Sequence, residues 1–279
     1  LTLCKSRSLI NCFFEPSTRT QSSFDLSAKH LSMDTNNVGG GSSIEKGESF
    51  IDTVETLDAY NVRVIVIRSN EAGVAEVASR HVRASIINAG DGWHEHPTQG
   101  LLDTLTMLDY FGATDLTGKI VTIVGDVKHS RVFGSLVRIM LKMGATVRIS
   151  APETLLPIEV STFGIKTFLD VEEALVDADV VYALRVQEER GANNVIPTLR
   201  EYSKTFGINE RRFDLAKPDA ILMHPGPVIR DVDVHSALVS RHPSSRILTQ
   251  VENGMAVRKA LLWLLSERFD GEVKSPILI

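Results

Sequence analysis

Cysteine is scarce in this sequence of 279 residues, which contains only Cys4 and Cys12. The two are not in a CxxC spacing, and no further cysteine is present to build a disulfide framework. Such usage is typical of reducing compartments, so we expect a cytoplasmic protein. A single disulfide between Cys4 and Cys12 is the alternative.

Long apolar runs are also missing. No stretch approaches the roughly 20 apolar residues that a membrane span needs, and the N-terminus lacks the features of a signal peptide. We therefore expect a soluble protein that does not bind membranes. Because the chain starts at Leu1 rather than Met and enters a strand-like segment by Ser8, we also expect the native protein to have a further N-terminal piece.

Clusters of basic residues are absent as well. The formal net charge is −5, from 30 basic and 35 acidic residues, and no Lys/Arg run is long enough to bind nucleic acid. We expect the partners to be small molecules or other protein chains. The composition, 43% hydrophobic and 23% charged, is typical of a globular chain long enough for one large or two medium domains.

Short runs rich in valine and isoleucine alternate with amphipathic helical stretches along the chain. This alternation predicts the α/β class, with parallel strands joined by crossover helices. Two glycines in the segment 111–118 mark a domain boundary, and the apolar helix 254–269 is expected to pack back onto the first domain. The predicted strands are 9–14, 62–67, 85–88, 120–124, 146–149, 180–184 and 220–223.

Polar side chains follow most of these strands. Because ligands of open parallel sheets bind outside the carboxyl ends of the strands, we expect these side chains to face one cleft. They include four arginines, Arg19, Arg68, Arg131 and Arg185.

The first of these segments, Pro16-Ser-Thr-Arg-Thr20, has the composition of a helix start. Free backbone N–H groups there, together with Arg19 and the hydroxyls of Ser17, Thr18 and Thr20, could cradle a phosphate. Simple N-capping with a solvated Arg19 is the alternative.

His96-Pro-Thr-Gln99 also lies at a predicted helix start, where His96 could polarise a carbonyl and Gln99 could hold an amide. A structural histidine is the alternative. A further alternative is a metal site formed by Asp91, His94 and His96, although no other close cluster of His or Cys is present to complete its ligand set.

Arg131 begins an apolar helix and Arg185 ends a buried strand, so each is expected to meet a carboxylate. That carboxylate could be an internal Asp or Glu. Alternatively, the two guanidinium groups could bind a dicarboxylate ligand. The segment His224-Pro-Gly-Pro227 is either a rigid turn or a stiff loop whose carbonyls accept hydrogen bonds from a ligand amide.

In this order and spacing, the motifs resemble those of the catalytic chains of the aspartate transcarbamoylase family, over nearly the whole sequence. The resemblance implies two doubly wound parallel-sheet domains with the active site in the cleft between them: residues 1–112 for carbamoyl phosphate and residues 113–253 for L-aspartate. The implied reaction is carbamoyl transfer to L-aspartate, the committed step of de novo pyrimidine synthesis. The matching segments are 13–20, 46–48, 96–99, 125–126 with Arg131, 185–187 and 224–227.

Site roles follow from the same resemblance. Arg68 and the segment Ser17, Thr18, Arg19 and Thr20 would hold the phosphate, and His96 would polarise the carbonyl oxygen. The carbamoyl amide would be held by Gln99 and the carbonyls of Gly226 and Pro227, and the aspartate carboxylates by Arg131, Arg185 and Gln187.

The family also uses a loop from a neighbouring subunit, so the resemblance implies a homotrimer with shared active sites. Ser42 and Lys46 would be the loop ligands, with Ser43 as an alternative to Ser42. Without the resemblance, Lys46 would be taken as one exposed lysine in a Gly/Ser loop. Regulatory or dihydroorotase chains could join the trimer. Neither a metal nor an organic cofactor is implied.

Three rival interpretations remain. An ornithine transcarbamoylase should carry a cysteine in the motifs that match 96–99 and 224–227 and should lack the Lys46 loop. This sequence has no cysteine in either motif and has Lys46, so both features speak against that interpretation. A dinucleotide-binding dehydrogenase would need a glycine fingerprint that is absent after the strand at 120–124. A non-catalytic homologue would have no need of intact Arg19, Lys46, His96 and Arg131.

Overall fold

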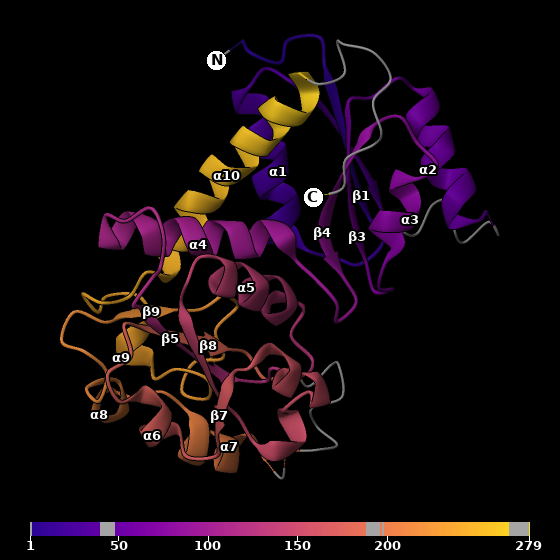
Figure 1. Cartoon of the computed structure of the whole chain (residues 1–279). Helices are drawn as coiled ribbons and strands as arrows, with labels where there is room; N and C mark the ends of the chain where they lie inside the picture. The colour runs from indigo at the N-terminus through magenta and orange to yellow at the C-terminus, as the bar shows by residue number, and fades with distance from the viewer. Residues whose placement is uncertain (1, 40–47, 188–195, 197, 268–278) are drawn as a thin grey trace. The chain divides into compact units, whose positions relative to one another are not determined.

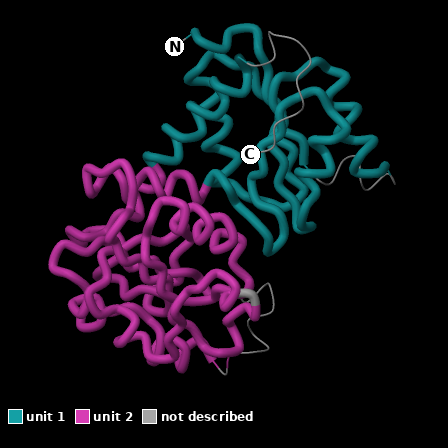
Figure 2. Tube along the Cα trace, viewed as in Figure 1, with its two compact units in different colours: residues 1–98, 252–279 teal, residues 99–251 magenta. Residues whose placement is uncertain are grey.

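The computed structural model describes residues 2–39, 48–187, 196, 198–267 and 279. The chain forms two compact units, Leu1–Thr98 with Glu252–Ile279 (unit 1) and Gln99–Val251 (unit 2), which are coloured separately in Figure 2. The chain passes from one unit to the other inside two helices, α4 (Pro97–Phe111) and α10 (Ile247–Glu267). None of the helices in the described ranges is long and apolar enough to cross a membrane.

Unit 1 contains a four-stranded parallel sheet in the order β2-β1-β3-β4. The chain runs from β1 outward to β2 and then returns to β3 on the other side of β1, so the strand order reverses between β1 and β3. Such a reversal is the topological switch point where open α/β sheets bind ligands. The strands are β1 (Ser8–Phe13), β2 (Asp34–Gly39), β3 (Val64–Ser69) and β4 (Ser85–Asp91).

Helices cover both faces of this sheet (Figure 1). On one face, α2 (Phe50–Ala59) and α3 (Val74–Ser79) pack on alternate strand residues such as Ile10 and Cys12. On the other face, α1 (Thr18–His30) buries Phe24 and Ala28. Strands covered on both sides favour apolar residues on both faces, which explains the apolar run Val64–Ile67 of β3 and the mostly apolar sequences of β1 and β4.

Unit 2 contains a five-stranded parallel sheet in the order β7-β6-β5-β8-β9, with its own switch point between β5 and β8. The strands are β5 (Ile120–Gly125), β6 (Thr146–Ser150), β7 (Lys166–Phe168), β8 (Val180–Leu184) and β9 (Ile221–Met223). The helices are α5 (Arg131–Lys142), α6 (Val171–Leu175), α7 (Leu199–Phe206), α8 (Glu210–Phe213) and α9 (Ser236–Val239), with two 3-10 turns at Glu153–Leu155 and Ile158–Phe163.

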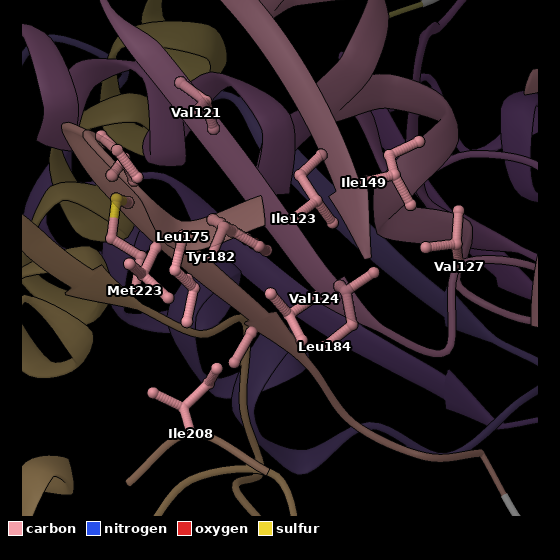
Figure 3. Packing of buried hydrophobic residues seen from close by; sticks show 14 of the residues in the cluster. Val121, Ile123, Val124, Val127, Ile149, Leu175, Tyr182, Leu184, Ile208 and Met223 are labelled. Carbon is pink, nitrogen blue, oxygen red and sulfur yellow. The ribbon is translucent and has the colours of Figure 1, made fainter. Parts of the chain in front are cut away.

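The core of unit 2 lies on both faces of its central strands. Figure 3 shows Val121 and Ile123 of β5 with Tyr182 and Leu184 of β8, all of which are at most 1% exposed. Helix α5 buries Leu136, Val137 and Met140 from its apolar side. This close packing makes the ends of β5 and β8 a stiff base for the loops that follow them.

The predicted α/β class and its two parallel sheets are confirmed. Each of the seven predicted strands is present within two residues of its predicted start, but β2 and β7 were not predicted. Both lie at sheet edges, and β2 has the polar sequence Asp-Thr-Asn-Asn-Val-Gly with four of its six positions exposed. The final helix begins at Ile247, so the prediction that it starts at residue 254 was wrong.

Candidate active site

The start of α1 lies directly after β1, at the switch point of unit 1. Ser17 is the N-cap residue, and its hydroxyl accepts no hydrogen bond from the first turn. Thr18 and Arg19 are exposed, whereas Thr20 is buried. The first N–H groups of a helix have no partner within the helix, and together with the helix dipole they favour a bound anion.

Arg68 lies near the end of β3, on the other side of the same switch point. Its Nη1 donates to the carbonyl of Ala89 at 3.0 Å, and its Nη2 lies 3.4 Å from Oε1 of Glu15. The backbone N–H of Phe14 donates to the Arg68 carbonyl at 2.8 Å, which fixes the β1–α1 connection beside this residue. The guanidinium side chain is 12% exposed and is therefore held in place, with its charge close to the start of α1.

His96 and Gln99 are placed by the start of α4. His96 immediately precedes the helix and is 6% exposed, and Gln99 lies in its first turn. The Nε2 of Gln99 donates to Oδ1 of Asp103 at 2.9 Å. Upstream, Asp91 binds the Nδ1 of His94 at 3.0 Å. No group of three or more His, Cys, Asp or Glu in the described part of the chain is arranged to hold a metal ion.

Asp126 connects the two loops at the switch point of unit 2. This carboxylate is fully buried and accepts hydrogen bonds from the Gln187 N–H at 3.0 Å and from Nδ1 of His129 at 2.9 Å. It therefore joins the loop after β5 to the residues after β8. Arg131, 3% exposed, begins α5 on one side of this link.

Arg185 and Gln187 lie on the other side of the link. The Nη2 of Arg185 donates to Oε1 of Gln187 at 2.9 Å, and both residues are half-buried. The intervening Val186 is buried, and its N–H donates to Oδ1 of Asp233 at 3.3 Å. Two buried carboxylates thus hold the main chain between Arg185 and Gln187, so that these two polar side chains are presented together.

The turn after β9 is held by hydrogen bonds on several sides. The N–H of His224 donates to Oε1 of Gln250 at 2.9 Å, and the Gly226 N–H donates to Nδ1 of His224 at 2.8 Å. The Nε2 of His224 lies 3.4 Å from Oδ2 of Asp233. Gly226 has a φ of 68° and precedes Pro227 through a cis peptide bond. The hydrogen bonds of His224 and Gly226 make the turn stiff, and because Gly226 is half-buried and Pro227 is exposed, the turn reaches solvent.

Each unit therefore brings its own share of the predicted residues together. Unit 1 contains the predicted residues after β1 and within β3, together with His96 after β4. Unit 2 contains Gln99 at the start of α4 and the predicted residues after β5, β8 and β9, which are neighbouring strands of its sheet. Ser42, Ser43 and Lys46 lie outside the described residues.

The sequence prediction missed the buried polar residues that support the site. Asp103 and Asp233 are 0% and 2% exposed, and Gln250 is 2% exposed. The sequence contains no clear signal for them, because Asp103 lies in a stretch that also contains the polar residues Thr104 and Thr106.

Comparison with known proteins agrees with this arrangement. Residues 1–109 match the family described as "Aspartate/ornithine carbamoyltransferase, carbamoyl-P binding domain". Residues 117–265 match the family described as "Aspartate/ornithine carbamoyltransferase, Asp/Orn binding domain". The two matches together cover most of the chain.

Individual relatives distinguish the two branches of this family. The aspartate carbamoyltransferase catalytic subunit of Acetivibrio thermocellus is 48% identical over 269 residues, covering 96% of this chain and 85% of the relative. The aspartate transcarbamoylase of Trypanosoma cruzi, crystallised with carbamoyl phosphate and aspartate, is 33% identical with a TM-score of 0.82, covering 94% of this chain and 85% of that one.

An ornithine carbamoyltransferase from Thermus thermophilus has the same fold, with a TM-score of 0.83 over 94% of this chain and 87% of that one, but its sequence identity is 26%. The fold is thus common to both branches, whereas the sequence is more similar to the aspartate enzymes. The chain belongs to the aspartate/ornithine carbamoyltransferase family, on its aspartate carbamoyltransferase branch.

Proposed function

We propose that this chain transfers the carbamoyl group of carbamoyl phosphate to the amino group of L-aspartate, giving N-carbamoyl-L-aspartate and phosphate. The pair of arginines at each switch point carries the proposal: Arg19 and Arg68 in unit 1, and Arg131 and Arg185 in unit 2. Two sites rich in arginine suit two anionic substrates, a phosphate ester and a dicarboxylate.

Unit 1 supplies the phosphate site in this proposal. The N–H groups at the start of α1, the hydroxyls of Ser17, Thr18 and Thr20, and the guanidinium of Arg19 bind the phosphate oxygens. Arg68 lies beside them and binds on the side where the phosphate meets the carbonyl. Its fixed position supports this role, because a preorganised cation needs no rearrangement when negative charge develops.

The carbamoyl group itself has a polar carbonyl and an amide, and the proposal assigns separate partners to each. His96 donates to the carbonyl oxygen, which gains negative charge when the carbon is attacked. Gln99 and the carbonyls of Gly226 and Pro227 accept hydrogen bonds from the amide. The stiffness of the turn after β9 supports this assignment, since fixed acceptors select for a group that can donate.

Unit 2 supplies the aspartate site. Arg131, Arg185 and Gln187 bind the two carboxylates of aspartate, and the hydrogen bond from the Gln187 N–H to Asp126 supports their joint action. The carbamoyl-phosphate domain is residues 1–112 and the aspartate domain is residues 113–253 in this assignment. The family matches at 1–109 and 117–265 support it.

The reaction needs orientation and charge stabilisation rather than a covalent enzyme intermediate. The neutral amine of aspartate attacks the carbamoyl carbon, a tetrahedral intermediate forms, and the C–O bond to phosphate breaks. The departing phosphate takes the proton from the amine. Arg19, Arg68 and His96 stabilise the negative charge on the phosphate and the carbonyl oxygen, and bound orientation lowers the entropic part of the barrier.

Assembly is a further part of the proposal. We assign Ser42 and Lys46 to the active site of a neighbouring subunit in a homotrimer. A chain kept monomeric would then have lower activity than the trimer at equal active-site concentration, and gel filtration with light scattering against activity measures this.

Substituting one arginine in each unit tests the assignment of the two substrates. Arg19→Ala should raise the KM for carbamoyl phosphate and lower kcat, whereas Arg131→Ala should mainly raise the KM for aspartate. Loss of a charge-assisted hydrogen bond corresponds to roughly 10–100-fold in kcat/KM.

The matched controls are exposed arginines changed in the same way. Arg80 follows directly after α3 of unit 1, as its C-cap residue, and Arg138 lies on α5 with Arg131; the control variants are Arg80→Ala and Arg138→Ala. Both controls should keep the kinetics of the unchanged protein. Near-normal turnover of the Arg19→Ala variant would overturn the phosphate assignment.

A further inference from the structure

Asp103, which has no role in the function proposed above, is a fully buried carboxylate on α4 of unit 2. Its Oδ1 accepts hydrogen bonds from Nε2 of Gln99 at 2.9 Å and from Nε2 of Gln250 at 2.7 Å. Its Oδ2 accepts a hydrogen bond from the hydroxyl of Tyr182 at 2.6 Å. Donors from three separate elements, α4, α10 and β8, therefore converge on one side chain.

A carboxylate that only accepts hydrogen bonds determines how its carboxamide neighbours are turned. Gln250 must point its NH₂ group at Asp103, which leaves its oxygen to accept the N–H of His224 at 2.9 Å. Gln99 must likewise point its NH₂ group at Asp103, which turns its own oxygen away from the carboxylate. If either carboxamide were flipped, its oxygen would face the carboxylate oxygen, and two acceptors would meet inside the protein. The flipped orientation should therefore be several-fold less populated.

The phenol of Tyr182 is the third donor to Asp103, on the oxygen that the glutamines do not use. Burial, followed by the nearby charge and hydrogen bond of Asp103, raises the pKa of Tyr182 well above its ordinary value. The hydroxyl therefore stays protonated and remains a donor to Oδ2 at any pH near neutral. This hydrogen bond adds to the stability of the buried carboxylate, whose other oxygen holds both glutamines.

We propose that Asp103 is the positioning residue for recognition of the carbamoyl amide, by turning the Gln99 oxygen outward and by holding the His224–Pro227 turn through Gln250. The inference rests on the function proposed above, in which Gln99, Gly226 and Pro227 accept hydrogen bonds from that amide. All of these acceptors depend on one carboxylate that does not itself touch the substrate. Asp103 thus sets the preference for a carbamoyl group over an acyl group that has no N–H to donate.

Acetyl phosphate provides the test, because it replaces the amide by a methyl group and keeps the phosphate and the carbonyl. The measurement is the dissociation constant of each acyl phosphate, by calorimetry or by competition, for the unchanged protein and for Asp103→Asn. An asparagine has the same shape but can present either an oxygen or an NH₂ group to the two glutamines. The carbamoyl phosphate constant should rise roughly 10-fold, and the acetyl phosphate constant should change less than about twofold.

Two further variants separate positioning from general loss of stability. Tyr182→Phe removes a donor to Oδ2 but keeps both glutamine contacts, so it should lower the melting temperature and preserve the discrimination. Asp109→Asn, an exposed acid on the same helix, should change neither. If Asp103→Asn does not fold, Gln250→Met tests the same link, because it cuts the connection to His224 while Gln99 and Tyr182 still contact Asp103.

The outcomes distinguish the two levels of the proposal. A selective loss of carbamoyl phosphate binding in Asp103→Asn or Gln250→Met supports the role of Asp103. If Asp103→Asn weakens the binding of carbamoyl phosphate and acetyl phosphate by the same factor, the role of Asp103 is overturned and the proposed function stays in place. The same holds if Tyr182→Phe loses as much of the preference for carbamoyl phosphate as Asp103→Asn does. If the wild-type protein binds carbamoyl phosphate no better than acetyl phosphate, the assignment of Gln99, Gly226 and Pro227 to the carbamoyl amide is itself overturned.

Discussion

Gly125, the last residue of β5, is expected to be intolerant of any side chain. Its φ is +128°, and a Cβ placed on it would lie 2.4 Å from the carbonyl oxygen of Leu184 and 3.1 Å from the hydroxyl of Tyr202. The Leu184 oxygen belongs to the backbone of β8, so the contact can be relieved only if the ends of β5 and β8 move apart. The Gly125→Ala substitution therefore strains the point where the two loops of the proposed aspartate site begin.

The expected cost is the sum of two effects. The positive φ costs an alanine about 1–2 kcal/mol, and forced overpacking costs about 1–3 kcal/mol. The total of about 2–5 kcal/mol corresponds to a fall in melting temperature of roughly 4–20 °C for a unit of this size. Thermal unfolding followed by circular dichroism measures this fall.

Gly118→Ala is the matched control, because Gly118 also has a positive φ (+77°) but nothing lies within 4 Å of its added Cβ. It should cost about 1–2 kcal/mol, from the backbone alone. If Gly125→Ala and Gly118→Ala unfold at the same temperature, the close approach of β5 and β8 does not limit stability, and the reasoning is wrong.

Two further predictions concern buried titratable groups. Burial raises the pKa of the Cys12 thiol to about 12, and neither Cys12 nor Cys4 is exposed, so a thiol reagent at pH 8 should label the folded protein only after unfolding; fast labelling of the native state would contradict this. Because the pKa of Cys12 is raised on folding, its contribution to stability is complete below about pH 9 and is lost as the pH rises toward about 12. The pKa of Asp179 shifts in the opposite direction, below its ordinary value. Burial alone would raise this pKa, but hydrogen bonds from Lys217 and the Ile120 N–H, with the charges of Lys217 and Lys119, lower it. Its contribution is present above the unfolded pKa near 3.8 and is lost as the pH falls through the lower folded value, so Asp179→Asn should cost about 1–3 kcal/mol in urea unfolding at pH 7 and less at pH 3. An equal cost at both pH values would show that its charge is not what stabilises the protein.

Much of the fold could be predicted because its central strands have a strong local signal. Strands β1, β3, β5 and β8 are buried at nearly every position, so their sequences are mostly apolar on both faces and easy to recognise. The edge strand β2 has no such signal, because its side chains are largely exposed and its pairing with β1 comes from the fold. Helix α10 was predicted to start late because its first turns contain Gln250 and Asn253, polar residues that interrupt the apolar stripe.

The candidate site divides in a similar way. Arg19, Arg68, Arg131 and Arg185 could be named as candidates because each ends or comes after a strand, a position visible in the sequence. Asp103 could not, because its proposed role depends on Gln250, which is 147 residues away along the chain. Contacts over such separations are set by packing, which a single sequence does not reveal.

The most direct test of the proposed activity is carbamoyl-product formation from carbamoyl phosphate, with L-aspartate and L-ornithine offered in parallel to purified protein of known oligomeric state. We predict turnover with L-aspartate and none above background with L-ornithine. Turnover with L-ornithine, or a well-folded trimer that carbamoylates neither amine, would contradict the account.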